Sequence, residues 1–129
     1  MKKKTMCLIF SIFILSNCHN NKDDAVPIIY SIDIIQTNDI PMNKIDWLSL
    51  REDWARINIQ GDHFSINTKI QLEREGKISG GGYNFNFISS SKIECSISGW
   101  SIYGSGKYLV RAKNLDSDWS ADEVYITVY

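Results

Sequence analysis

The chain has 129 residues, of which 43% are hydrophobic and 22% are charged, and its formal net charge at pH 7 is −1. This length and apolar content suffice for one domain with a hydrophobic core. Beyond the N-terminus the sequence holds no basic patch or run. It therefore argues against a nucleic-acid partner, because neutralisation of phosphates dominates that kind of binding.

The first residues have the order of a secretory signal peptide. Lys2, Lys3 and Lys4 form a positive segment, and residues 6–15 are almost wholly apolar. This run is too short to span a bilayer, which needs about 20 apolar residues. It ends in Leu15-Ser16-Asn17-Cys18 instead of an A-x-A-like cleavage site. The ending resembles the lipobox of bacterial lipoproteins, although Asn17 stands where Gly, Ala or Ser is usual.

The lipobox resemblance implies that residues 1–17 are removed and that a diacylglycerol is attached to the thiol of Cys18. We expect residues 18–26 to be the acylated cysteine and a short flexible tether, since the polar segment 19–24 cannot bury a core. Lys22-Asp23-Asp24 resembles a surface-export signal of one group of Gram-negative bacteria. We therefore expect an outer-membrane lipoprotein at the cell surface. The alternatives are the periplasmic face, or an ordinary signal peptide with an incidental cysteine.

Removal of residues 1–17 leaves 112 residues with 11 basic and 15 acidic side chains, a net charge of −4. Cys7 leaves with the signal peptide and Cys18 is acylated, so Cys95 has no partner for an intrachain disulfide. Cys95 lies in the alternating stretch KIECSIS. We expect it to be a small buried apolar residue, and the fold to depend on its hydrophobic core.

Apolar and polar residues alternate throughout the mature chain, which is the period-2 pattern of half-buried strands. We expect seven strands and turns between them, with Gly80-Gly81-Gly82 as a flexible turn and 36–53 as one helical turn or an irregular crossover. Tyr83, Phe85 and Phe87 should point inward. Without helices to cover a parallel sheet, the pattern predicts an all-β, antiparallel, immunoglobulin-like sandwich. The expected strands are 27–35, 54–60, 68–74, 82–88, 92–98, 107–113 and 123–129.

Two stretches, RINIQGDHFSINTKIQLER and GKYLVRAKN, resemble the IPT/TIG domains, an immunoglobulin-like group. Gly61 and Phe64 match the family's Gly-x-x-aromatic between two strands, and Asn114 matches its closing Asn. The resemblance covers residues 27–129 and implies a non-catalytic module, of a kind found in receptors, DNA-binding factors, accessory modules of carbohydrate-active enzymes and surface lipoproteins. We expect Gly61 to adopt a positive φ on leaving its strand and Phe64 to plug the end of the sandwich.

Residues for catalysis or metal binding are sparse. Of the two histidines, His19 lies in the tether and His63 in a turn, so neither a hydrolase triad nor a zinc site is supported. We expect no enzymatic activity and no cofactor. A candidate calcium loop has its oxygens at alternate positions but lacks the glycine and glutamate of a complete loop. The alternative is a solvated acidic loop. The candidate consists of Asp116, Asp118, Ser120 and Asp122.

The aromatic residues suggest binding. Four tryptophans in this chain are many for a small sandwich, and several fall in expected loops. An exposed indole can stack on a sugar ring or anchor a protein partner; alternatively, these rings pack on the sandwich ends. We expect a membrane-anchored module that captures an extracellular ligand such as a glycan. The alternative is an assembly role, docking on another envelope protein through an edge strand. The candidate ligand-binding residues are Trp47, Trp100, Tyr103 and Trp119.

Overall fold

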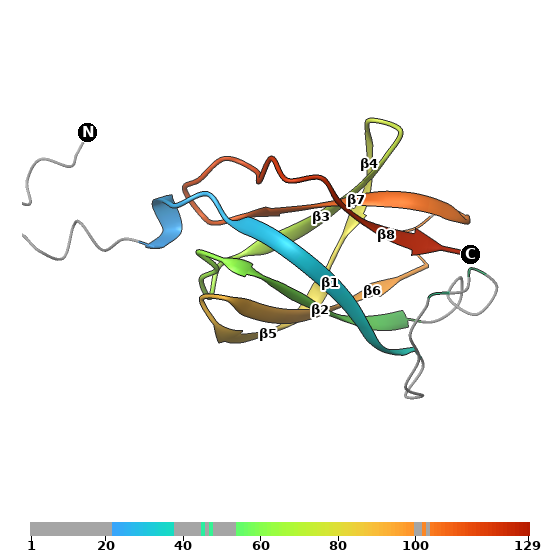
Figure 1. Ribbon diagram of the computed structural model, residues 1–129, viewed down its shortest axis with the longest axis horizontal. Coiled ribbons are helices and arrows are strands. Elements are labelled where there is room, and N and C mark those ends of the chain that lie inside the picture. Colours follow the sequence, from blue (N-terminus) through green and yellow to red (C-terminus); the bar gives the residue numbers. More distant parts are fainter. Residues whose placement is uncertain (1–21, 38–44, 46, 48–53, 100–101, 103) are drawn as a thin grey trace, which may run out of the picture.

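The computed structural model describes residues 22–37, 45, 47, 54–99, 102 and 104–129. Eight strands form two four-stranded antiparallel sheets that pack face to face (Figure 1). Sheet A has the order β1-β2-β6-β5, and sheet B has the order β4-β3-β7-β8. The strands are β1 (Ile28–Thr37), β2 (Trp54–Asp62), β3 (Lys69–Arg74), β4 (Lys77–Gly81), β5 (Tyr83–Ser89), β6 (Lys92–Ser98), β7 (Gly106–Lys113) and β8 (Val124–Val128).

This strand order is that of an immunoglobulin-like sandwich, with A-B-E-D in one sheet and C′-C-F-G in the other. A tyrosine at the start of the F strand supports the assignment. The buried Tyr108 in β7 donates its hydroxyl proton to the carbonyl of Gly104, 2.7 Å away and four residues upstream. Immunoglobulin-like domains use such a tyrosine corner to fix the entry into that strand. The all-β sandwich expected from the sequence is therefore confirmed.

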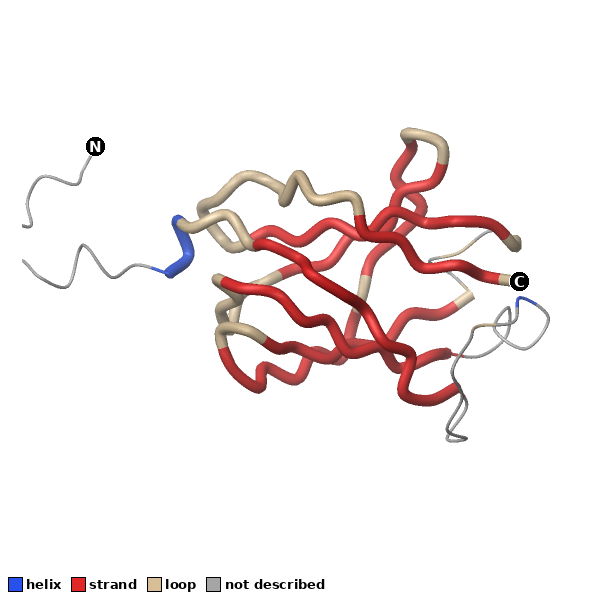
Figure 2. Tube along the Cα trace, in the orientation of Figure 1, coloured by secondary structure: helices blue, strands red, loops and turns tan. Residues whose placement is uncertain are grey.

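The core lies between the sheets and follows the alternation in the sequence. Ala55, Ile57 and Ile59 of β2 are fully buried, and alternate residues of β6 are buried beside them. Cys95 of β6 belongs to this core, as expected. Its burial raises the pKa of the thiol from 9.0 to about 12, and Arg56 opposes this only in part. Strands make up most of the described domain, and loops gather at its two ends (Figure 2).

The eighth strand is β4, where we expected only turns. Glu75 and Gly76 have φ values of 54° and 78° and join β3 to β4 in a two-residue hairpin. Two successive positive φ values are typical of a type I′ hairpin turn, for which Gly at the second position is favourable. The expected glycine turn at 80–82 is partly strand, since Gly81 pairs with Gln71 of β3. Consecutive glycines have no side chains to alternate between apolar and polar, so the period-2 pattern does not reveal this strand.

The triplet has a packing role where the chain passes from sheet B to sheet A. A Cβ at Gly81 would lie 2.7 Å from the carbonyl oxygen of Ile70, and one at Gly82 would lie 2.7 Å from Sγ of Cys95. Side chains at these positions would therefore collide with the core beneath the crossing.

Gly61 is also required for close approach and not for a positive φ, so that prediction was wrong. It lies inside β2, and a Cβ there would be 1.8 Å from the carbonyl oxygen of Ile28 in β1. The left-handed conformation after the strand belongs to His63, with φ of 65°. Phe64 is fully buried in the core, in agreement with its expected position.

The N-terminal segment is bound to one end of the sandwich from Asp23 onward. Lys22–Asp24, which we expected to lie in the flexible tether, forms the short 3-10 helix η2. The carboxylate of Asp23 accepts hydrogen bonds from Ser65 Oγ (2.7 Å) and Asn67 Nδ2 (3.0 Å). Its backbone carbonyl accepts one from the N–H of Asp116 (2.9 Å). The structured domain therefore begins before residue 27.

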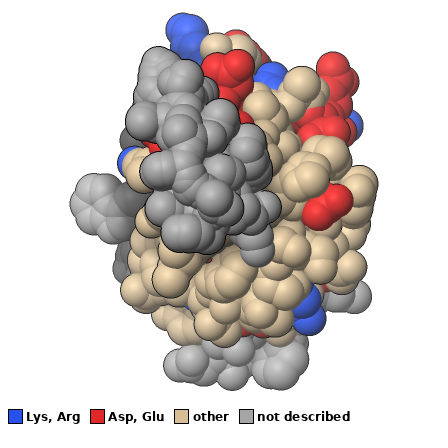
Figure 3. All heavy atoms as spheres, turned by 90° about the vertical axis from the view of Figure 1, so that its left-hand side faces the viewer, with Lys and Arg blue, Asp and Glu red and all other residues tan. Residues whose placement is uncertain are grey.

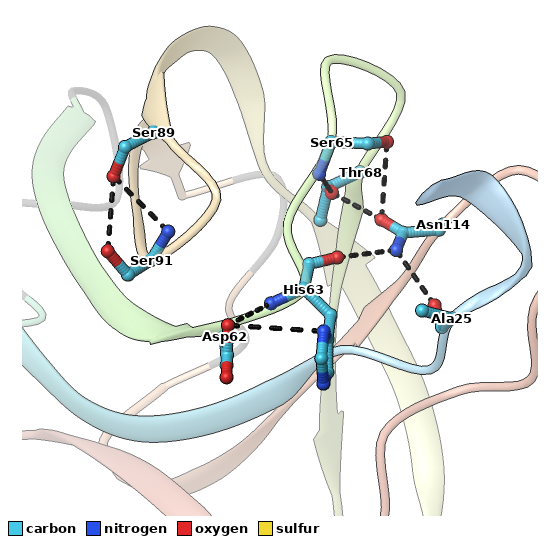
Figure 4. Close-up of polar contacts among 8 residues, drawn as sticks. All are labelled: Ala25, Asp62, His63, Ser65, Thr68, Ser89, Ser91 and Asn114. Atoms are coloured by element: carbon cyan, nitrogen blue, oxygen red, sulfur yellow. Dashed lines mark hydrogen bonds and ion pairs between the residues drawn. The ribbon is translucent and has the colours of Figure 1, made fainter. Parts of the chain in front are cut away.

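Asn114 fastens the same end of the sandwich from within (Figure 4). Its side chain is 1% exposed, and Nδ2 donates to the carbonyls of Ala25 (2.8 Å) and His63 (2.6 Å). Oδ1 accepts from Thr68 Oγ1 at 2.5 Å and, more weakly, from Ser65 Oγ at 3.4 Å. One buried amide thus joins the segment before β1, the β2–β3 loop and the end of β7.

Candidate functional site

The expected binding aromatics are not gathered in the described part of the chain. Trp100 and Tyr103, like the expected lipidation site Cys18, lie outside the described residues. Trp47 is half-buried against the core, and its backbone N–H donates to the carbonyl of Tyr129 at 2.9 Å. Trp119 is half-buried, with Nζ of Lys113 5.7 Å from its ring centroid.

The acidic loop between β7 and β8 supports neighbouring backbone. The buried Ser120 accepts the N–H of Ala112 at 2.9 Å, and Asp122 accepts the N–H of Ile29 at 3.1 Å. Asp116 and Asp118 are exposed. Figure 3 views this end and shows acidic side chains at several separate places on the surface. Among the residues that the structure describes, no three His, Cys, Asp or Glu side chains are grouped to hold a metal ion.

His63 is an exposed turn residue, as expected. The carboxylate of Asp62 accepts its backbone N–H at 2.8 Å, and Nδ1 of the ring lies 3.9 Å from the same oxygen (Figure 4). These contacts stabilise the left-handed turn after β2. Among the described residues, the ring has no contact with a nucleophilic side chain.

Three of the four sheet edges carry protection against further strand pairing. Ile45 covers β8 through a parallel bridge to Val128, and its carbonyl accepts the N–H of Tyr129 at 2.9 Å. The Asp122 carboxylate caps an edge N–H of β1. Strand β4 has only five residues, begins with Lys77 and ends in glycines. Short edge strands, lysines and side-chain caps are the usual devices that prevent an edge from recruiting another strand.

Strand β5, at the other edge of sheet A, has neither a charge nor a proline to protect it. The uncharged run extends over residues 83–91, and four of its large apolar side chains are exposed. We call these four residues the β5 edge. They are Tyr83 (38% exposed), Phe85 (41%), Phe87 (41%) and Ile88 (44%).

Tyr83, Phe85 and Phe87 were expected to point inward, but all three are exposed and none is part of the core. Tyr83 lies opposite Ser96 of β6, which belongs to the outer face. Phe87 lies opposite the buried Ile93, and so on the core side of the sheet, yet remains exposed. The β4 hairpin of sheet B projects away from the two layers, so the facing sheet does not cover this edge (Figure 1).

Two irregularities in the β5–β6 register, between Tyr83 and Asn86 and between Phe87 and Ser89, shape this edge. Asn84 has a positive φ of 52°. Arg56 of β2 reaches across β6 and donates through Nη1 to the carbonyl of Asn84 and to Ser96 Oγ. Bulges re-aim side chains and are frequent beside functional sites. Arg56 is a positioning residue that the sequence did not reveal, because a lone arginine in a strand gives no sign of its partner.

Neither models of known protein families nor curated proteins match this chain. Among the described residues, no helix is both long enough and apolar enough to cross a membrane.

Proposed function

We propose that the chain is a membrane-anchored, non-catalytic binding module of the cell envelope, and that it docks another envelope protein through the β5 edge. The observation that supports this function is the combination, on one edge strand, of a run without charge or proline and four exposed apolar side chains. Exposed edge strands can bind a partner by adding one of its strands to the sheet. Large apolar side chains that stay exposed on one strand of a small domain also suit an interaction site.

The chemistry of the edge points to an extended, uncharged segment of the partner. Backbone hydrogen bonds along β5 would provide the pairing, and aromatic or branched side chains of the partner would cover Phe85 and Phe87. A charge on that segment would be buried without a partner, since residues 83–91 carry none. We therefore assign the edge to a segment rich in apolar and uncharged polar residues.

The anchor and the family remain part of this proposal. The lipobox-like ending at Cys18 supports attachment to the outer membrane, with the cell surface as the expected side and the periplasmic face as the alternative. The residues that carry the IPT/TIG resemblance have structural positions: Gly61 at a close backbone approach, Phe64 in the core and Asn114 in the hydrogen-bonded end. These roles suit a non-catalytic scaffold. Glycan capture by the four expected loop aromatics has less support, because Trp47 packs against the core.

Site-specific photocrosslinking in the cells that make the protein tests the docking edge. A photoreactive phenylalanine analogue replaces Phe87, and in a matched control it replaces Tyr125, which is equally exposed (42%) but lies in sheet B. We expect a discrete protein adduct from position 87 and none from position 125. Equal adducts at both positions, or none at position 87, would contradict the proposal.

A purified partner then allows the contact to be measured. We expect Phe85→Asp with Phe87→Asp to weaken its binding to residues 19–129 by about a hundredfold, because two charges would be buried in an uncharged interface. The change Tyr125→Asp serves as the control and should leave the affinity within about twofold. Unchanged binding by the double variant would exclude the β5 edge as the site.

A further inference from the structure

The outer face of sheet B brings two lysines together. Lys69 of β3 and Lys113 of β7 are direct cross-strand partners. The next pair along, Ile70 and Ala112, is buried, so both lysines belong to the outer face. Directly opposed residues of an antiparallel pair have Cβ atoms about 5 Å apart, and like charges there are destabilising.

No carboxylate offsets this repulsion in the described part of the chain, where neither lysine lies within ion-pair distance of an acidic group. The nearest acidic side chain on the same face of β3 is Glu73, four residues after Lys69, and it pairs with other groups. Its Oε2 lies 3.2 Å from Nε of Arg111 and accepts a hydrogen bond from Gln71 at 2.9 Å. The mature chain is acidic overall, with a net charge of −4. Two adjacent lysines with no acidic partner among the described residues therefore differ from the rest of its surface.

An aromatic ring stands beside the lysine pair. Nζ of Lys113 lies 5.7 Å from the ring centroid of the half-buried Trp119. This cation–π contact keeps the ammonium and the indole together. A second such pair occurs on the same strand, where Nζ of Lys107 lies 4.8 Å from the ring of Tyr125. Lys107 and Lys113 are six residues apart, a span of about 20 Å along a strand.

We propose that this face binds an acidic saccharide, with a carboxylate or sulfate group between Lys69 and Lys113 and a sugar ring against Trp119. Sugars present apolar ring faces that aromatic side chains can cover, and an acidic substituent would remove the repulsion between the lysines. The second ring and lysine, Tyr125 and Lys107, extend the face for a chain of several sugars. The site lies in sheet B and is independent of the β5 edge, so either proposal can fail alone.

A charge reversal separates this role from a purely structural one. Lys69→Glu turns the like-charged pair into an opposite-charged pair, so we expect the Tm of residues 19–129 to rise by about 2 to 4 °C. The same change should abolish binding of a heparin-derived oligosaccharide and of an oligogalacturonate, which supply sulfate and carboxylate groups respectively. Lys92→Glu, on β6 of sheet A, changes the net charge equally and should leave affinity within about twofold.

Three measurements by titration calorimetry complete the test. We expect the affinity of the unmodified protein for at least one of the two saccharides to fall as salt rises, neutral dextran not to bind, and Trp119→Leu to weaken binding by about tenfold or more. Binding of neither acidic saccharide, retention of binding in Lys69→Glu, or equally tight binding of polyglutamate would overturn the proposal. The last result would show that the face selects charge and not a sugar.

Discussion

Replacing Asn114 by alanine should cost more stability than any other single change of a polar side chain at this end of the domain. The side chain is buried and joins three segments through the carbonyls of Ala25 and His63 and the hydroxyl of Thr68. Alanine would remove these three hydrogen bonds and the longer one from Ser65 Oγ. It would also leave the two carbonyls and the hydroxyl in a place that water reaches poorly.

The magnitude follows from these three contacts. A hydrogen bond contributes about 1 kcal/mol net, and a buried group left without a partner costs about 1 to 3 kcal/mol. Allowing for partial access of water, we expect Asn114→Ala to lower the free energy of unfolding by about 3 to 4 kcal/mol. A domain of this size has about 5 to 15 kcal/mol in total, so the loss would be a large fraction.

Urea unfolding of residues 19–129, followed by tryptophan fluorescence, measures this difference. Asn67→Ala is a suitable control, because Asn67 is exposed and its amide makes one hydrogen bond, to Asp23. It should cost less than about 1 kcal/mol. A loss below about 1 kcal/mol for Asn114→Ala as well would refute the view that this amide fastens the end of the sandwich.

The isosteric change Asn114→Asp tests the polarity of the same contacts. It replaces the donating amide by an oxygen that faces the carbonyls of Ala25 and His63, so the charged form is disfavoured and the pKa of the new carboxyl is raised. Relative to the unmodified protein, the variant should therefore lose more free energy of unfolding at pH 7, where its carboxyl is ionised, than at pH 4, where the protonated carboxyl can donate a hydrogen bond. A deficit that is the same at both pH values would contradict this geometry.

Three further changes test the fold and the anchor. Gly61→Ala should lower the free energy of unfolding by about 3 kcal/mol or more, because the added Cβ would meet the Ile28 carbonyl oxygen at 1.8 Å; a loss under about 1 kcal/mol would show that β1 can move aside. Burial raises the pKa of Cys95 to about 12 against an ordinary 9.0, so the thiol should resist iodoacetamide at pH 8 until urea unfolds the chain. Because the unfolded thiol ionises first, its contribution to stability should be lost as the pH rises from about 9 towards 12, and Cys95→Ala should flatten that decline. In cells fed radioactive palmitate, Cys18→Ala should abolish labelling, and labelling that persists would exclude Cys18 as the anchor.

The strands and most of the core could be predicted from the sequence, because a half-buried strand must alternate apolar and polar residues whatever its neighbours are. Ile57, Ile59 and Cys95 were placed correctly on this basis. The same alternation misplaced Phe85 and Phe87, since a period of two indicates two faces but not whether a second layer covers one of them. In the structure the β4 hairpin of sheet B projects away from the two layers (Figure 1), and both rings are exposed.

Contacts between distant segments were beyond the sequence for a similar reason. The sequence indicated that glycine is needed at position 61. The reason, the close approach of Ile28, depends on strand pairing across 33 residues. The opposition of Lys69 and Lys113 likewise exists only in the β3–β7 register. Some features depend only on neighbours in sequence and can be predicted along the chain. They include the hydrophobic periodicity, the signal-like N-terminus and the burial of Cys95 within an alternating stretch. Which edge stays open, and which charges meet, depends on how the sheets are paired and stacked, and only the tertiary structure decides that.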